Sequence, residues 1–270
     1  MGDKTLIIIG EKINSSLKGV TEAVKNRDVD FIQQRALEQA QNGADYIDVN
    51  CGTLIDEEVE ALPWLVQTVQ QVVNKPCCID SPNPLALAAA LKVHKGKPMI
   101  NSITGEEERY TAIMPLVKEY QANIIALVMD DEHGMPKSAA ARINAGTKLI
   151  ERMQADGVPV NHIYIDPLVQ PISTSSDMAI VVIDTIKGIR ELYPTVHFMC
   201  GLSNVSFGLP KRGLLNRTFL TLCMLAGLDG AILDPGNRQM MSMVIATEAL
   251  LNKDAFTKQY LKSYRKGLLE

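Results

Sequence analysis

Carboxylates and carboxamides recur where the apolar segments of this chain end. The residues concerned include Asp48, Asn50, Asp80, Asn101, Asp166 and Asn204. Carboxylate oxygens accept hydrogen bonds, whereas a carboxamide both accepts and donates them. Lys, Arg and His are nearly absent from the same positions, although a phosphate-rich ligand would require basic groups and glycine-rich loops. The pattern therefore predicts a binding site for a neutral heterocycle that presents several N–H donors.

A simpler role for each of these side chains is to cap the helix that follows it. Oxygen atoms of Asp and Asn accept hydrogen bonds from the free N–H groups of a first helical turn. Asn83, which precedes Pro84, is expected to be such a cap. Capping alone does not predict that one segment end after another carries Asp or Asn, so we interpret the set as a site.

Apolar segments alternate with helical patterns along the whole chain, at a spacing of roughly 30 residues. The eight predicted strands span residues 6–10, 46–50, 77–81, 99–102, 124–129, 163–166, 196–201 and 231–234. The predicted helices span residues 31–41, 83–94, 106–120, 138–155, 177–192, 214–226 and 238–251, and a further one opens at Pro63. Continuous apolar runs are typical of parallel strands that are buried on both faces.

We predict an α/β fold, a single (β/α)8 TIM-barrel domain over residues 1–270. In such a barrel the carboxyl ends of the strands converge on one mouth, where barrel enzymes keep their active sites. A doubly wound open sheet is the alternative. Residues 254–270 are highly charged and are expected to form a helical tail outside the barrel.

Composition excludes several classes of protein. The net charge of −4, without a cluster of Lys and Arg, argues against a nucleic-acid partner. The apolar runs are too short for a membrane span. The five cysteines are odd in number and lack CxxC spacing, which indicates reduced thiols, a cytoplasmic location and no tightly bound metal.

Common catalytic motifs are also missing. The chain has no GxSxG elbow, no HExxH motif and no P-loop. Paired carboxylates could hydrolyse glycosides, but sugar sites generally add aromatic platforms, and aromatic residues are only 5% of this chain. The polar strand ends thus remain the main candidate for chemistry.

Six segments taken in order carry a specific resemblance to one family. They are Gly10-Glu11-Lys12-Ile13-Asn14, Asp48-Val49-Asn50, Asp80-Ser81, Asn101-Ser102, Asp166-Pro167-Leu168 and Gly201-Leu202-Ser203-Asn204-Val205-Ser206. The chain resembles the methyltetrahydrofolate:corrinoid protein methyltransferases, which belong to the superfamily of pterin-binding barrels. Cobalamin-dependent methionine synthase has a similar folate barrel, and dihydropteroate synthase is a more distant relative.

The resemblance implies roles for individual residues. Asp80, Asn101 and Asp166 match the positions that hydrogen-bond the pterin, and Asn204 matches the catalytic asparagine that approaches N5. An amide suits that place because it can donate a hydrogen bond to N5 or accept one from N5–H.

Further residues match the same site. Asp48 and Asn50 match a polar pair after the second strand, and Ser203 and Arg212 lie in the loop that carries the asparagine. The resemblance implies that all four help to bind the folate.

The implied reaction moves a methyl group between N5 of tetrahydrofolate and the cobalt of a corrinoid. No cobalamin-binding module is evident in the sequence. We therefore expect the cobalamin on a separate corrinoid protein that docks at the barrel mouth, and relatives suggest a homodimer. Transfer from the methylcorrinoid protein to tetrahydrofolate, within a catabolic demethylation, is slightly favoured over the reverse. A dihydropteroate-synthase-like enzyme and a non-catalytic folate-binding component are the alternatives.

Overall fold

The strands form a closed barrel in a computed structural model that describes residues 6–270. The strands are β1 (Ile7–Asn14), β2 (Tyr46–Asn50), β3 (Cys77–Asp80), β4 (Met99–Ile103), β5 (Asn123–Leu127), β6 (Ile163–Asp166), β7 (His197–Gly201) and β8 (Gly230–Leu233). Each strand pairs in parallel with the next, and β1 closes the ring on β8. The predicted (β/α)8 barrel is confirmed, and the open doubly wound sheet is excluded.

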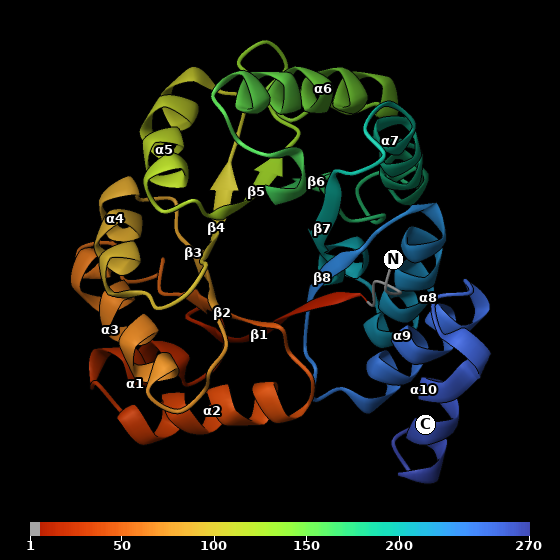
Figure 1. The fold of residues 1–270 in the computed structure, drawn as a ribbon, viewed down its shortest axis with the longest axis horizontal. Helices are drawn as coiled ribbons and strands as arrows, with labels where there is room; N and C mark the ends of the chain where they lie inside the picture. The colour runs from red at the N-terminus through yellow and green to blue at the C-terminus, as the bar shows by residue number, and fades with distance from the viewer. Residues whose placement is uncertain (1–5) are drawn as a thin grey trace.

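Helices surround the barrel, as Figure 1 shows in a view along its axis. They are α1 (Val20–Lys25), α2 (Val29–Gln41), α3 (Glu58–Gln70), α4 (Pro84–Val93), α5 (Glu107–Glu119), α6 (Ala139–Ala155), α7 (Met178–Leu192), α8 (Arg212–Ala226), α9 (Arg238–Leu250) and α10 (Lys258–Arg265). Short 3-10 helices are η1 (Val160–His162), η2 (Leu202–Ser206) and η3 (Ala255–Thr257). Asn83 caps α4 as expected, because its side chain accepts from the N–H of Leu85 at 3.0 Å.

The prediction that a helix opens at Pro63 is wrong. Helix α3 begins at Glu58, and Pro63 lies inside it. Proline is favoured in a first turn, because no N–H is needed there. A tertiary contact accounts for the earlier start, since the buried Glu58 carboxylate accepts a hydrogen bond from the Ser81 hydroxyl at 2.7 Å.

Apolar side chains form two separate clusters. The larger one lies between the strands and the surrounding helices. The smaller one fills the inside of the barrel and consists of Ile9, Cys78, Met99, Ile125, Tyr164 and Met199. We call this smaller cluster the floor. It contains one side chain from each of six strands, so the barrel is a packed core and not a pore.

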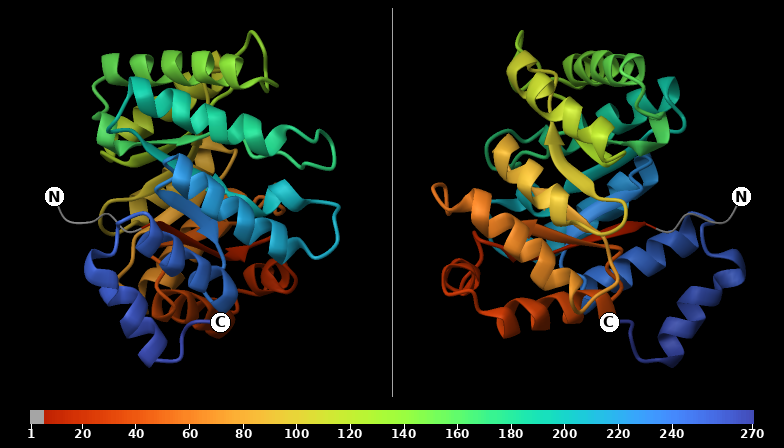
Figure 2. Two further views of the ribbon diagram at one scale, coloured as in Figure 1. Left: turned by 90° about the vertical axis from the view of Figure 1, so that its right-hand side faces the viewer. Right: turned by 60° about the vertical axis from the view of Figure 1, so that its left-hand side comes forward.

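The C-terminal segment extends away from the barrel. Figure 2 shows α10 projecting beside α9 at the lower part of the molecule. The segment is tied back to α9 near its end, because the Glu270 N–H donates to the Ser242 hydroxyl at 2.9 Å and Arg238 pairs with the Glu270 carboxylate at 3.1 Å. No helix within residues 6–270 has the length and apolar character needed to cross a bilayer.

Gly105 joins the ends of β4 and β5 at the mouth of the barrel. Its N–H donates to the Met129 carbonyl at 2.8 Å, and a Cβ at Gly105 would lie 2.8 Å from the same oxygen. We expect Gly105→Ala to lower the free energy of unfolding by about 1–3 kcal/mol, because backbone must shift to admit the methyl group. Denaturant unfolding measures the change.

Gly201→Ala is the matched control for this substitution. Gly201 has a φ of −79°, and a Cβ added to it would meet no atom from elsewhere in the chain within 4 Å. Its replacement should change the free energy of unfolding by less than about 0.5 kcal/mol. Equal losses in the two variants would contradict the steric explanation.

Candidate active site at the barrel mouth

Three of the predicted pterin-binding residues point into the barrel just above the floor. Alternate residues of a strand face the same side, so a residue two positions after a floor residue also faces inward. The pairs are Cys78 with Asp80, Met99 with Asn101 and Tyr164 with Asp166. Asp80 and Asn101 are also direct partners in the register of β3 and β4. The structure thus brings the three side chains together at the mouth.

Asn50 and Asp48 extend this set from the neighbouring strand β2. The Asn50 amide donates to the Asp80 carboxylate at 2.9 Å, and its oxygen accepts from the N–H of Gly52 at 3.1 Å. Asp48 is buried, and its Oδ1 atom has no hydrogen-bond partner among residues 6–270. Burial, followed by the charge of Asp80, raises the pKa of Asp48 well above its usual value.

The other two carboxyl groups are half-buried. Burial raises the pKa of Asp80, although the hydrogen bond from Asn50 and the charge of Arg109 oppose the shift. Burial raises the pKa of Asp166 to about 6, against the hydrogen bond from the N–H of Leu168 and the charge of Arg142. A carboxylate with a raised pKa is short of hydrogen-bond donors, which is what a ligand rich in N–H groups supplies.

Arg109 on α5 joins the ends of β3 and β4 from behind. Its guanidinium donates to the carbonyl of Ser81 at 2.9 Å, to that of Ser102 at 2.7 and 3.0 Å, and to that of Pro82. Ser81 and Ser102 directly follow Asp80 and Asn101. The planar fork of one arginine therefore holds the two strand ends in fixed relation.

Arg142 on α6 does the same for β6. The side chain is fully buried and donates to the carbonyls of Pro167 at 2.9 Å, Leu168 at 2.8 Å and Pro136 at 2.8 Å. Leu168 in turn donates its N–H to the Asp166 carboxylate at 2.8 Å. The conformation of the backbone after Asp166 thus depends on a buried cation.

Asn204 lies at the edge of the mouth, in η2. Its side chain is exposed and makes no hydrogen bond within residues 6–270, so both amide groups are available to a ligand. Arg212 fixes the turn around it, because its guanidinium donates to the Ser203 carbonyl at 2.7 Å and to the Ser206 hydroxyl at 3.1 Å. Ser203 and Arg212 therefore lie together at the turn that carries Asn204.

Glu11 is a candidate site residue that the sequence did not single out. It is half-buried, and burial together with the charge of Asp234 raises its pKa. The neighbouring Lys12 pairs with Asp234 at 2.7 Å. The register of β1 against β2 shifts between Gly10 and Ile13. Such a bulge breaks the alternation of inward-facing and outward-facing residues along the strand. The direction of the Glu11 side chain could therefore not be predicted from the sequence.

Two hollows lie elsewhere on the molecule. One of about 450 Å³ includes Val117, Val158 and His162, and another of about 580 Å³ lies between α5 and α6. Neither contains any of the inward-facing Asp and Asn residues. We place the candidate site at the mouth because the inward-facing carboxylates and amides converge there.

Comparison with known proteins shows the family of the chain. Residues 10–234 match the model of the pterin-binding enzymes, so the chain belongs to that family. It is 39% identical over 264 residues to the methylcorrinoid:tetrahydrofolate methyltransferase of Eubacterium limosum, with 97% of each chain covered. It is 31% identical over 243 residues to the methionine synthase of Mycobacterium tuberculosis, which covers 85% of this chain but 20% of that enzyme.

Two solved structures with the same fold are dihydropteroate synthases. The enzyme from Clostridium difficile has a TM-score of 0.75 at 20% identity, covering 92% of this chain and 98% of that one. The enzyme from Vibrio fischeri has a TM-score of 0.73 at 16% identity, covering 93% and 95%. At these identities the likeness shows the shared barrel alone.

The raised pKa of Asp166 predicts how ligand binding depends on pH. N–H donors of a reduced pterin favour the ionised carboxylate, so binding lowers the pKa of Asp166. Affinity should consequently fall as the pH is lowered through about 6, approaching about tenfold per pH unit. Calorimetric titration with a tetrahydropterin between pH 5 and 7.5 measures this dependence.

Asp166→Asn provides the control, because an amide does not titrate. Its affinity should be lower at pH 7.5 and should depend less on pH than that of the unaltered protein. An unchanged pH dependence in Asp166→Asn would assign the titration to another group.

Proposed function

We propose that this protein transfers a methyl group from the cobalt of a methylcorrinoid protein to N5 of tetrahydrofolate. The main observation behind this proposal is that Asp80, Asn101 and Asp166 lie together above the floor. The Asn204 amide, which makes no hydrogen bond within residues 6–270, lies at the edge of the same mouth. The relative from Eubacterium limosum, which is similar over nearly its whole length, supports this reaction.

The proposed pterin contacts follow from hydrogen-bonding chemistry. A reduced pterin presents its 2-amino group and ring N–H groups along one edge. The carboxylates of Asp80 and Asp166 accept from such donors, while the Asn101 amide both donates and accepts. Asn50 lies one strand away and orients Asp80 through its hydrogen bond, and Asp48 lies on the same strand as Asn50. The edge of the ring would be held by side chains from three strands, which fixes its orientation.

In the proposed chemistry, Asn204 holds the reacting nitrogen. The N5 lone pair forms the new N–CH3 bond, while the cobalt–carbon bond breaks and its electron pair stays on cobalt, reducing Co(III) to Co(I). The N5 proton leaves to solvent. The Asn204 oxygen can accept from N5–H as positive charge develops, and its NH2 group can donate to N5 in the reverse direction. Asn204 therefore acts as an electrostatic stabiliser, since an amide does not titrate near neutral pH.

Asn204→Ala should lower the rate of methyl transfer far more than it lowers the affinity for tetrahydrofolate. The loss in transition-state stabilisation should be about 2–4 kcal/mol, as for other hydrogen-bonding groups at developing charge. Single-turnover kinetics with a methylated corrinoid protein, together with a binding titration, separate the two effects. Equal losses of rate and affinity would contradict the proposed role.

The same assays separate this function from its alternatives. A folate-binding component without catalysis predicts tight binding and no turnover. A dihydropteroate synthase must bind a pyrophosphate, but the mouth carries the acidic groups Glu11, Asp48, Asp80, Asp166 and Asp234. Formation of dihydropteroate from a pterin pyrophosphate and 4-aminobenzoate would overturn the methyltransferase proposal.

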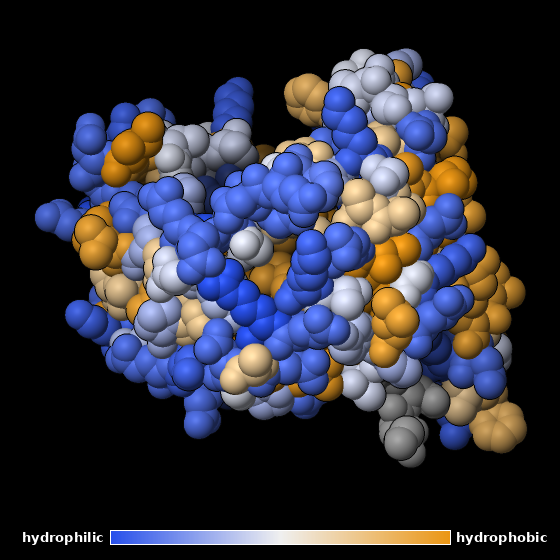
Figure 3. Space-filling view, turned by 90° about the horizontal axis from the view of Figure 1, so that it is seen from above, coloured by the Kyte–Doolittle hydropathy of each residue, from blue (hydrophilic) through white to orange (hydrophobic). Residues whose placement is uncertain are grey.

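We further infer that the chain is cytoplasmic and works as a homodimer. All five cysteines are free and buried, which suits a reducing compartment. Figure 3 shows apolar side chains gathered on the right-hand side of the molecule, where Figure 1 places α7 and α8. The exposed residues Leu192 on α7 and Leu222 and Leu225 on α8 supply an apolar face that a second copy would cover.

Leu192→Asp combined with Leu225→Asp should convert the proposed dimer to monomers, because buried unpaired carboxylates oppose association. Light scattering coupled to size exclusion measures the mass, and it should fall by half. The circular dichroism spectrum should not change, since both side chains are exposed. A monomeric unaltered protein, or a dimer that survives both substitutions, would remove this interface.

A further inference from the structure

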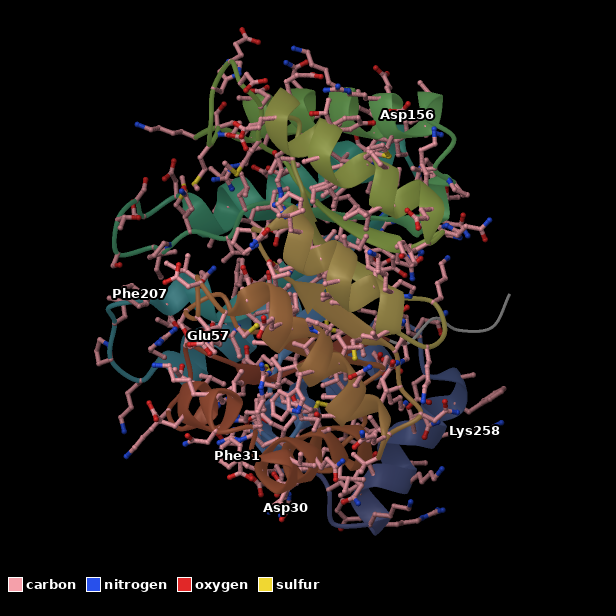
Figure 4. All side chains as sticks on the ribbon, turned by 90° about the vertical axis from the view of Figure 1, so that its left-hand side faces the viewer. Asp30, Phe31, Glu57, Asp156, Phe207 and Lys258 are labelled. Carbon is pink, nitrogen blue, oxygen red and sulfur yellow. The ribbon has the colours of Figure 1, made fainter. Side chains whose placement is uncertain are left out.

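Large apolar side chains are exposed on four separate loops that follow strands of the barrel. Leu17, Ile55, Met135 and Phe207 are 37%, 79%, 43% and 63% exposed. They lie in the connections after β1, β2, β5 and η2, which all emerge at the carboxyl ends of the strands. Figure 4 shows Phe207 and Glu57, which is two residues from Ile55, at the same end of the barrel, away from Lys258. We call these four residues the apolar rim.

Two of the rim residues, Ile55 and Phe207, lie beside buried residues that anchor their loops. Leu54, next to Ile55, is buried, and Val205, two residues before Phe207, is buried as well. These buried neighbours supply the internal packing of the two loops. The exposed side chains contribute apolar surface to solvent in a region where loops are usually polar. Exposed apolar surface can mark a contact site for another molecule.

The proposed reaction requires a large second substrate at the same place. Methyl transfer brings the carbon on cobalt to within about 3–3.5 Å of N5, as near-attack geometry demands. The pterin occupies the mouth, so a corrinoid carried by another protein must approach from outside and lie across the surrounding loops. The polar groups inside the barrel mouth would bind the pterin. The loops around the mouth would then contact the corrinoid protein.

We propose that Leu17, Ile55, Met135 and Phe207 form the docking surface for the methylcorrinoid protein. This inference rests on the proposed methyltransferase function. Aromatic residues and methionine, here Phe207 and Met135, are enriched at protein–protein interfaces. The carrier is predicted to present a complementary apolar surface around its corrinoid.

Two donors of the methyl group separate docking from chemistry. Free methylcobalamin carries the same reactive group but no protein surface, so it does not use the rim. Leu17→Ser combined with Ile55→Ser should raise the KM for the methylated corrinoid protein at least about tenfold, a change of about 1.4 kcal/mol. The same variant should retain its rate with free methylcobalamin and its affinity for tetrahydrofolate.

Leu250→Ser is the matched control. Leu250 is 84% exposed at the end of α9, outside the rim, so its replacement changes surface hydrophobicity to a similar extent. It should leave the KM for the corrinoid protein unchanged. Phe207→Ser tests the rim from a third loop, although Phe207 also lies 5.7 Å from the Arg212 guanidinium.

Each result has a defined meaning. An unchanged KM for the corrinoid protein in the Leu17→Ser and Ile55→Ser double variant overturns the docking surface. An equal loss with free methylcobalamin overturns it too, because the substitutions would then act on the site itself. If the unaltered protein transfers no methyl group from either donor, the proposed function fails instead.

Discussion

The chemistry of the barrel mouth depends on three carboxyl groups that are largely shielded from water, one of them buried and two half-buried. Asp48, Asp80 and Asp166 all have raised pKa values, and burial is the first cause in each case. Such groups favour the folded state most at acidic pH, and this contribution is lost as pH rises through the folded pKa. Two arginines hold the surrounding backbone through its carbonyl groups. Because the arginines bond to backbone carbonyls, they leave carboxylate oxygens at the mouth free to accept hydrogen bonds. A ligand with N–H groups can donate to these oxygens.

The barrel itself could be predicted because its strands are buried on both faces and therefore appear as continuous apolar runs. The less predictable features depend on contacts between distant residues. The start of α3 at Glu58 depends on Ser81 in another segment. The bulge in β1 depends on pairing with β2, which local sequence does not specify. Helix α5 continues through Pro115, although a proline inside a helix usually bends or ends it.

The site was predicted in part from residue type and position. Asp80 and Asp166 end strands of one parallel barrel, and Asn101 lies two residues before the end of another. The barrel necessarily brings such ends together. The role proposed for Asn204 rests on a family resemblance, because a lone amide has no distinctive spacing. Arg109 and Arg142 could not be recognised, since their partners are backbone carbonyls, which every sequence contains. Their roles become visible only when the direction of each side chain is known.

The floor of the barrel has a kinetic consequence. Its six apolar side chains close the interior from below, so the mouth is the entrance through which a pterin reaches Asp80 and Asp166. A carrier protein resting on the apolar rim covers that entrance. Under the proposed function, tetrahydrofolate must therefore bind before the carrier, and the methylated product must leave after it. The sequential order of substrates is then a property of the architecture, independent of their relative affinities.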